Sequence, residues 1–300
     1  MNVIITGASG FVGQNLTKYL IENEHIVQSL SLRNDNWINQ FDNKADAIIH
    51  LAGKAHDTAN TSHDQEYFDV NYYLTVHLFE EFIKSDIKDF FYFSSVKAVA
   101  DSVDTIVRED ITGNPLTAYG RSKYQAEQYL LGNKLAEGKR LFIIRPCMIH
   151  GPGNKGNLNL LFNVVKKGIP WPLASFHNER SFLSVDNLSF LIKAMLETKD
   201  LDSGIYNFAD DESLSTNDLV TLISETLGKK PRLSAIPSAF IKALVKAGDF
   251  LPLPLNSERL KKLTESYVVS NEKIKQALYL RQLPISAKEG LKHTIQSFIK

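Results

Sequence analysis

Short apolar runs along the chain alternate with longer stretches in which apolar residues recur at helical spacing. The runs typical of buried strands are Asn2–Thr6, Ile26–Leu32, Ala47–Leu51, Asp89–Ser94 and Leu141–Arg145. The stretches with helical spacing are Gly13–Asn23, Tyr67–Ser85 and Ala118–Lys134. Strands that alternate with amphipathic helices predict an α/β fold, in which a doubly wound parallel sheet is covered by helices on both faces.

The pattern changes after Gly151-Pro152-Gly153. Loops rich in glycine and proline follow, with amphipathic stretches at Ser215–Leu227 and Ala239–Ala247. We expect a sheet domain made of residues 1–155 and roughly 182–208, and a smaller, interleaved C-terminal lobe made of residues 156–181 and 209–300. Ligands of open α/β sheets bind beyond the carboxyl ends of the strands, so the lobe is expected to close over that edge.

The segment between the second and third strand-like runs is short. About a dozen residues, Asn34 to Ala45, separate these runs. A further strand with its crossover needs more chain than this. We therefore expect the sheet to lack one strand beside the second.

Composition narrows the classes of protein that fit. The chain has 300 residues, 43% of them hydrophobic, and 34 basic residues balance 34 acidic ones. A net charge of zero argues against nucleic acid or an anionic membrane as a partner. The single cysteine, Cys147, excludes an internal disulfide, and the sequence shows neither a secretion signal nor a long apolar run. We expect a cytoplasmic protein without membrane insertion.

A glycine-rich turn follows the first strand directly. Its sequence is Gly7-Ala8-Ser9-Gly10-Phe11-Val12-Gly13, and a helical stretch comes next. Glycines let the backbone turn tightly and approach a diphosphate, whose charge lies at the helix N-terminus. A tight turn without a ligand is the alternative. We interpret the sheet domain as a Rossmann-like dinucleotide-binding domain.

The end of the second strand bears on the choice of cofactor. An acid there holds the ribose 2′-hydroxyl of NAD, whereas a basic group accepts the 2′-phosphate of NADP. The chain has Ser31-Leu32-Arg33 at this place. A hydroxyl and a guanidinium suit a phosphate, which favours NADP(H) over NAD. Arg33 as an ordinary solvated residue is the alternative.

Tyr119 and Lys123 provide the central chemical signal. Their spacing puts a phenol and an ammonium on one helix face, so Lys123 is expected to lower the pKa of Tyr119 and suit it to proton transfer. Ser94-Ser95 ends the preceding strand, and both hydroxyls are expected at the same edge of the sheet, beside the same site.

Together these motifs resemble the extended short-chain dehydrogenase/reductase enzymes that act on nucleotide sugars, of the NAD-dependent epimerase/dehydratase family. The resemblance implies a catalytic set of Ser95, Tyr119 and Lys123. It further implies that cofactor is bound by Gly7, Ser9, Gly10, Phe11, Val12, Gly13, Ser31, Arg33, Leu51, Ala52, Gly53, Asn71, Tyr119, Lys123 and Pro146. A homodimer through Tyr67–Ser85 and Ala118–Lys134 is a family expectation.

A finer resemblance points to bacterial polysaccharide pathways. Its segments are His50–His56, Ser94–Lys97 and Gly151–Asn157. It implies that Asn157 and Arg180 bind a UDP diphosphate, although Asn157 as a helix cap and Arg180 in an ordinary ion pair are the alternatives. Lys54, His56 and Lys97 are further candidate substrate residues. The histidines lack metal-ligand spacing, so no metal is expected.

One departure from the family excludes a reaction. The resembled 4,6-dehydratases carry an Asp-Glu pair after the catalytic hydroxyl, whereas this chain has Val96 and Lys97. We therefore expect an NADPH-dependent reductase acting at C4 of a UDP-4-keto-6-deoxy-N-acetylhexosamine. A UDP-hexose or UDP-N-acetylhexosamine 4-epimerase with retained NAD is the alternative, and a non-catalytic nucleotide-binding module is the third.

Overall fold

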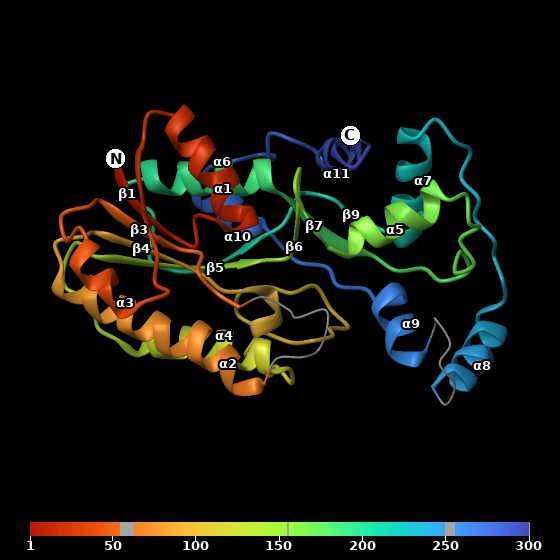
Figure 1. Ribbon diagram of the computed structural model, residues 1–300, viewed down its shortest axis with the longest axis horizontal. Helices are drawn as coiled ribbons and strands as arrows, with labels where there is room; N and C mark the ends of the chain where they lie inside the picture. Colours follow the sequence, from red (N-terminus) through yellow and green to blue (C-terminus); the bar gives the residue numbers. More distant parts are fainter. Residues whose placement is uncertain (55–62, 155, 250–255, 300) are drawn as a thin grey trace.

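A computed structural model of the chain describes residues 1–54, 63–154, 156–249 and 256–299 (Figure 1). The strands are β1 (Asn2–Thr6), β2 (Ile26–Leu30), β3 (Ala47–His50), β4 (Asp89–Phe93), β5 (Arg140–Pro146), β6 (Met148–His150), β7 (Arg180–Ser184), β8 (Gly204–Phe208) and β9 (Ser213–Leu214). The α-helices are α1 (Phe11–Glu22), α2 (Asp64–Phe68), α3 (Leu74–Lys84), α4 (Ala118–Gly132), α5 (Asn157–Lys166), α6 (Val185–Glu197), α7 (Thr216–Thr226), α8 (Ser238–Gly248), α9 (Ser257–Thr264), α10 (Glu272–Ala277) and α11 (Ala287–Ser297). Short 3₁₀ helices occur at η1 (Asp35–Gln40) and η3 (Val96–Ala98), and a π-helical turn, η2 (Asp69–Tyr73), joins α2 to α3.

Six parallel strands form the main sheet in the order β2-β1-β3-β4-β5-β8. β2 lies on one side of β1, and the strands from β3 onward lie on its other side. The strand order thus reverses between β1 and β3, where Thr6 lies beside His50. This reversal is where doubly wound folds bind their ligands. The predicted α/β doubly wound fold is confirmed.

Alternate residues of the central strands β1, β3, β4 and β5 are buried on opposite faces of the sheet. In β4, Phe91 and Phe93 join one apolar cluster, while Phe90 and Tyr92 join another. Such strands are apolar throughout because a parallel sheet is covered on both sides. In Figure 1, α1, α6 and α10 cover one face, and α2, α3 and α4 cover the other.

The stretch after β2 contains a 3₁₀ helix in place of another strand. Among the described residues, β2 is the outermost strand of the sheet on this side. The side chain of Trp37, within η1, is buried and packs edge-on against Phe41. The expected absence of a strand beside the second is therefore observed.

A smaller lobe lies at the far end of the molecule, built around the strands β6, β7 and β9 (Figure 1). Its apolar cluster joins side chains from α5, α7, α8, α9 and α11. The chain returns from this lobe to the main sheet through β8, and α6 packs against α1. The division into residues 1–155 with 182–208, and 156–181 with 209–300, stays a prediction.

No helix in the described segments is both long enough and apolar enough to cross a membrane.

Candidate active site

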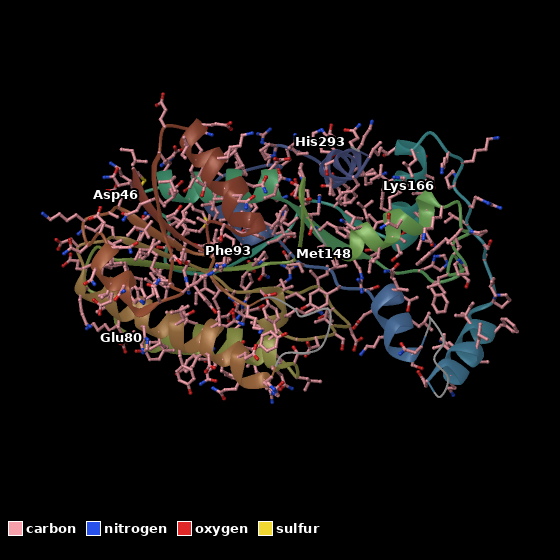
Figure 2. All side chains as sticks on the ribbon, in the orientation of Figure 1. Asp46, Glu80, Phe93, Met148, Lys166 and His293 are labelled. Atoms are coloured by element: carbon pink, nitrogen blue, oxygen red, sulfur yellow. The ribbon has the colours of Figure 1, made fainter. Side chains whose placement is uncertain are left out.

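A cavity of about 230 Å³ lies beyond the carboxyl ends of β3, β4 and β5. Its lining comprises Val12, Leu51, Gly53, Lys54, Phe93, Ser94, Ser95, Tyr119, Lys123, Pro146, Cys147 and Ile149. In Figure 2, Phe93 at the end of β4 and Met148 at the start of β6 lie in the middle of the molecule, where the main sheet meets the lobe. The structure thus gathers residues predicted for catalysis, cofactor and substrate around one space. Ser94 lies at this edge as expected, whereas Phe93, Cys147 and Ile149 were not predicted from the sequence.

The glycine turn between β1 and α1 packs closely on the end of β3. Gly7 has a φ of +70°, and a Cβ there would lie 2.7 Å from the Ala52 nitrogen. A Cβ on Gly13 would lie 2.3 Å from the Gly7 oxygen. No side chain caps α1 at Gly10, so the first-turn N–H groups are available to an anion. The turn therefore fits a dinucleotide diphosphate.

Tyr119 lies in the first turn of α4, which begins at the Thr117 cap, where the Thr117 hydroxyl accepts the Gly120 N–H at 3.2 Å. The Tyr67 ring meets the Tyr119 ring edge-on, with centroids 6.3 Å apart. Burial raises the pKa of Tyr119, and a hydrogen bond with Ser95 partly opposes the rise. We expected Lys123 to lower this pKa. That prediction is wrong for the protein without ligand, because the net shift is upward and Lys123 is not among its causes.

Lys123 points its ammonium toward the end of β4. Its Nζ donates to the Phe93 carbonyl oxygen at 2.7 Å and lies 4.9 Å from the centroid of the Tyr92 ring. Burial lowers the pKa of Lys123 to about 8, and the Glu127 carboxylate acts in the opposite direction. Lys123 is thus mostly a cation at neutral pH, and it loses its charge as the pH rises through about 8.

A buried ion pair lies one helical turn beyond Lys123. Arg145 Nη2 and Glu127 Oε2 are 2.6 Å apart, and both side chains are at most 2% exposed. The Ser94 hydroxyl donates a short hydrogen bond to the same carboxylate. Sequence reasoning missed this pair, although the spacing between Lys123 and Glu127 places them on one helix face.

Asn71 ties η2 to the end of β3. Its Oδ1 accepts the Lys54 N–H at 2.8 Å, and its Nδ2 donates to the Lys54 carbonyl at 3.1 Å and to Ser122 Oγ at 3.0 Å. A Cβ on Gly53 would lie 3.0 Å from this Oδ1 and 3.1 Å from Lys123 Nζ. Asn71 therefore supports the cavity wall rather than lining it.

His50 lies beneath the cavity at the end of β3. Its two ring nitrogens are 2.7 Å from Thr6 Oγ1 and 2.9 Å from Thr75 Oγ1. Burial lowers the pKa of His50 to about 3, and Lys123 lowers it further in the same direction. The ring is thus neutral at physiological pH and links β1, β3 and α3.

Ser31 and Arg33 are both exposed just after β2. No acidic residue lies between positions 31 and 33. Because Leu30 at the end of β2 pairs with Thr6 of β1, Ser31 and Arg33 follow the strand next to the one that leads into the glycine turn.

Three cations lie near one another between the sheet and the lobe. Lys97 Nζ donates to the Asp101 carbonyl at 2.6 Å and lies 4.2 Å from the Tyr267 ring centroid. Burial lowers the pKa of Lys97, and Arg180 and Lys261 contribute in the same direction. Arg180 Nε donates to the Glu265 carbonyl at 2.9 Å. Sequence reasoning missed Lys261.

Two predicted substrate residues are not fully described. His56 lies outside the described residues, and so does the side chain of Asn157, although Asn157 begins α5. Lys54 lines the cavity and pairs with Glu66 of α2.

The fold and the cavity define a class of protein. A doubly wound sheet, a glycine turn open to a diphosphate, and a serine, tyrosine and lysine around one cavity are the parts of a nicotinamide-dependent short-chain dehydrogenase/reductase.

Comparisons with known proteins agree. The model of the NAD dependent epimerase/dehydratase family matches residues 3–209. The chain belongs to this family, so the expected extended short-chain dehydrogenase/reductase and NAD(P)-dependent enzyme are confirmed.

Relatives and solved structures cover the whole chain. It is similar to UDP-glucose 4-epimerase of Vibrio cholerae, with 28% identity over 100% of the chain and 96% of the relative. It is equally similar, at 28% over 98% of the chain and 94% of the relative, to N-acetyl-alpha-D-glucosaminyl-diphospho-ditrans,octacis-undecaprenol 4-epimerase of Escherichia coli O157:H7. The structure of UDP-N-acetylglucosamine 4-epimerase from Bacillus cereus superposes with a TM-score of 0.78 at 19% identity, each chain covered to 100%.

Proposed function

We propose that the protein is an NADPH-dependent reductase acting at C4 of a UDP-4-keto-6-deoxy-N-acetylhexosamine, in bacterial surface polysaccharide synthesis. The observation that carries the cofactor choice is the pair Ser31 and Arg33, both exposed just after β2, with no acidic residue among positions 31–33. Such groups suit the 2′-phosphate of NADP. Solved structures of this fold carry either cofactor: RMD from Pseudomonas aeruginosa is complexed with NADPH, and MoeE5 with NAD.

The chain's own residues account for the proton that the reduction needs. NADPH supplies hydride to the C4 carbonyl carbon. Tyr119 holds its proton at neutral pH because burial raises its pKa, and it donates this proton to the carbonyl oxygen. Ser95 donates a second hydrogen bond to that oxygen, and the Lys123 cation stabilises the phenolate that Tyr119 becomes. The carbonyl thereby becomes an alcohol.

The surroundings of Ser95 disfavour dehydration. Val96 is buried and apolar, and the Lys97 ammonium is bound to a backbone carbonyl. Neither position holds the carboxylic acid and carboxylate that removal of water across C5 and C6 requires.

A 4-epimerase with retained NAD is the second candidate, favoured by the two relatives at 28% identity. An epimerase first removes a proton from the sugar hydroxyl, so it needs Tyr119 as a base. Ser95, Tyr119 and Lys123 serve either start, so our preference for the reductase rests on Ser31 and Arg33 after β2. A non-catalytic module has no need for Ser95, Tyr119 and Lys123 around one cavity, so we rank it third.

The test is to follow reduced nicotinamide absorbance with UDP-4-keto-6-deoxy-N-acetylglucosamine and either NADPH or NADH. We expect faster use of NADPH, and a reversed preference in Arg33→Asp, whereas Arg281→Asp, at another exposed arginine, keeps the wild-type preference. Tyr119→Phe should bind cofactor but turn over about a hundredfold more slowly or worse.

If neither NADPH nor NADH is oxidised in this assay, the proposed reductase is contradicted. Conversion of UDP-N-acetylglucosamine to its 4-epimer without added cofactor would establish the second candidate. A cytoplasmic homodimer that contacts through α3 and α4 is proposed on family grounds alone.

A further inference from the structure

The balanced net charge of the chain conceals an uneven distribution. Residues 229–247 contain five basic residues and no acidic one, namely Lys229, Lys230, Arg232, Lys242 and Lys246. Because the whole chain has 34 residues of each sign, the remainder carries an acidic excess. A local positive field therefore exists although the net charge is zero.

This basic segment lies at the edge of the lobe farthest from the main sheet. Figure 1 shows the chain leaving α7 and running along this outer edge to α8. Residues 228–233 are all exposed. The segment is anchored on its inner side, where the Trp171 N–H donates to the Arg232 carbonyl at 2.8 Å and the Ser234 N–H donates to the Trp171 carbonyl at 2.9 Å.

α8 presents apolar side chains on two faces, and only one is needed for the fold. Ile241 and Val245 are buried in the apolar cluster of the lobe. Phe240 and Leu244, one turn apart, are 64% and 50% exposed. Lys242 and Lys246 are exposed on the same helix. Residues two positions apart point to different sides of a helix, so Lys242 and Lys246 lie on another face of α8 than Phe240 and Leu244. An exposed apolar pair with lysines on a separate face is the composition of a helix that lies in a membrane interface.

The same combination recurs where the segment begins. A cavity of about 520 Å³ is lined by Lys229, Lys230 and Arg232 together with the apolar Val165, Ile169 and Val220. Ile169 is 50% exposed, and Leu233 beside it is 42% exposed. Apolar side chains with basic groups around them thus continue along the edge that leads to α8.

We propose that this edge, residues 229–247 with Ile169, is a surface that docks the protein on an anionic lipid bilayer. Phe240 and Leu244 enter the headgroup region, while Lys230, Lys242 and Lys246 contact lipid phosphates. Lys229 and Arg232 donate to the carbonyls of Lys166 and Gly168, which holds the segment on the lobe, and they add to the positive field. The occupant is a membrane surface rather than a second copy of the chain, because two copies facing each other through this segment would bring like charges together. Docking needs no membrane-spanning helix, and it is independent of the proposed reaction.

The experiment is flotation of the full-length protein with vesicles of phosphatidylcholine alone or mixed with phosphatidylglycerol. Wild type should float with the mixed vesicles only, and high salt should release it. The variants Phe240→Ser/Leu244→Ser and Lys242→Gln/Lys246→Gln should each weaken binding roughly tenfold or more. Both should keep the wild-type melting temperature, since all four side chains are exposed.

The matched control removes two exposed apolar side chains elsewhere. Ile21→Ser/Ile26→Ser changes residues that are 55% and 70% exposed on the opposite part of the molecule, and it should float like wild type. Wild type that stays unbound, that floats equally with neutral vesicles, or that is unaffected by Phe240→Ser/Leu244→Ser would overturn the proposal. A second result would also overturn it. If wild type does not float, and Phe240→Ser/Leu244→Ser changes the sedimentation coefficient measured without vesicles, the occupant of this surface is a second copy of the chain.

Discussion

Lys123 is held at the cavity by contacts that act on its charge in opposite directions. Its ammonium is buried beside the Phe93 carbonyl and the Tyr92 ring, and burial lowers its pKa to about 8. Glu127 opposes this effect, and it is fixed in place by Arg145 and Ser94. The ion pair thus positions the residue that keeps Lys123 charged near neutral pH.

Glu127→Gln should move the pH dependence of turnover. Activity that requires cationic Lys123 is present below its pKa and is lost as the pH rises through about 8. Without the carboxylate the pKa falls further, so the loss should begin at lower pH. Glu80→Gln, an exposed partner of Tyr129, should leave the pH profile unchanged.

The same substitution leaves the Arg145 charge buried without its partner, which costs about 3–5 kcal/mol. Thermal unfolding therefore accompanies the kinetics. If Glu127→Gln does not fold, the same pH profile is measured on Glu127→Gln/Arg145→Gln, in which no charge is left buried without its partner. An unchanged alkaline limb in a folded variant would show that Glu127 has only a structural role.

At the scale of elements, the turn from β1 to α1 sets how closely α1 approaches the sheet. A methyl group on Gly13 would lie 2.3 Å from the Gly7 oxygen, and that oxygen belongs to backbone that cannot rotate away. The helix would have to shift outward, and its N-terminus would shift with it.

Gly13→Ala should therefore lower the free energy of unfolding by about 1–3 kcal/mol and weaken binding of the nicotinamide cofactor. Urea denaturation and a cofactor fluorescence titration measure the two effects. Gly132→Ala, at the end of α4 with nothing within 4 Å of the new methyl group, should be neutral or stabilise by up to about 1 kcal/mol. Equal behaviour of the two variants would contradict a packing role for Gly13.

The elements that could be predicted from the sequence are those with a strong local signal. The strand at Asn2–Thr6 was predicted with its observed bounds, because an apolar run buried on both faces looks unlike its neighbours. β8 was missed, since Gly204–Phe208 mixes glycine, tyrosine and asparagine in five residues. The π-helical turn at Asn71 has no periodic signature. Cys147 reaches the cavity wall through tertiary packing, which spacing along the chain does not encode.

At the scale of the whole molecule, acid stability depends on a histidine that is buried without charge. His50 bridges Thr6 and Thr75 at the centre of the fold, and its pKa in the folded protein is lowered to about 3 from the ordinary 6.5. Between these values the unfolded chain binds a proton that the folded chain does not. The stability contribution is therefore intact above pH 6.5 and is lost as the pH falls.

We expect His50 to make the free energy of unfolding fall by about 1.4 kcal/mol per pH unit below pH 6.5. Urea denaturation at a series of pH values gives the slope. His50→Gln should be less stable at neutral pH but flatter toward acid, whereas His293→Gln, exposed on α11, should follow wild type. A slope that survives in His50→Gln would assign acid sensitivity to other groups.

The cavity also contains a ready-made chemical handle. Cys147 is the only cysteine of the chain and lies in the cavity wall next to Pro146. Burial raises the pKa of its thiol, so the thiolate is scarce and alkylation is slow. A ligand that fills the cavity should cover Cys147 and slow alkylation further. The rate at which a thiol reagent adds to Cys147, followed by the mass of the intact protein, therefore reports ligand occupancy of the cavity without any engineered label.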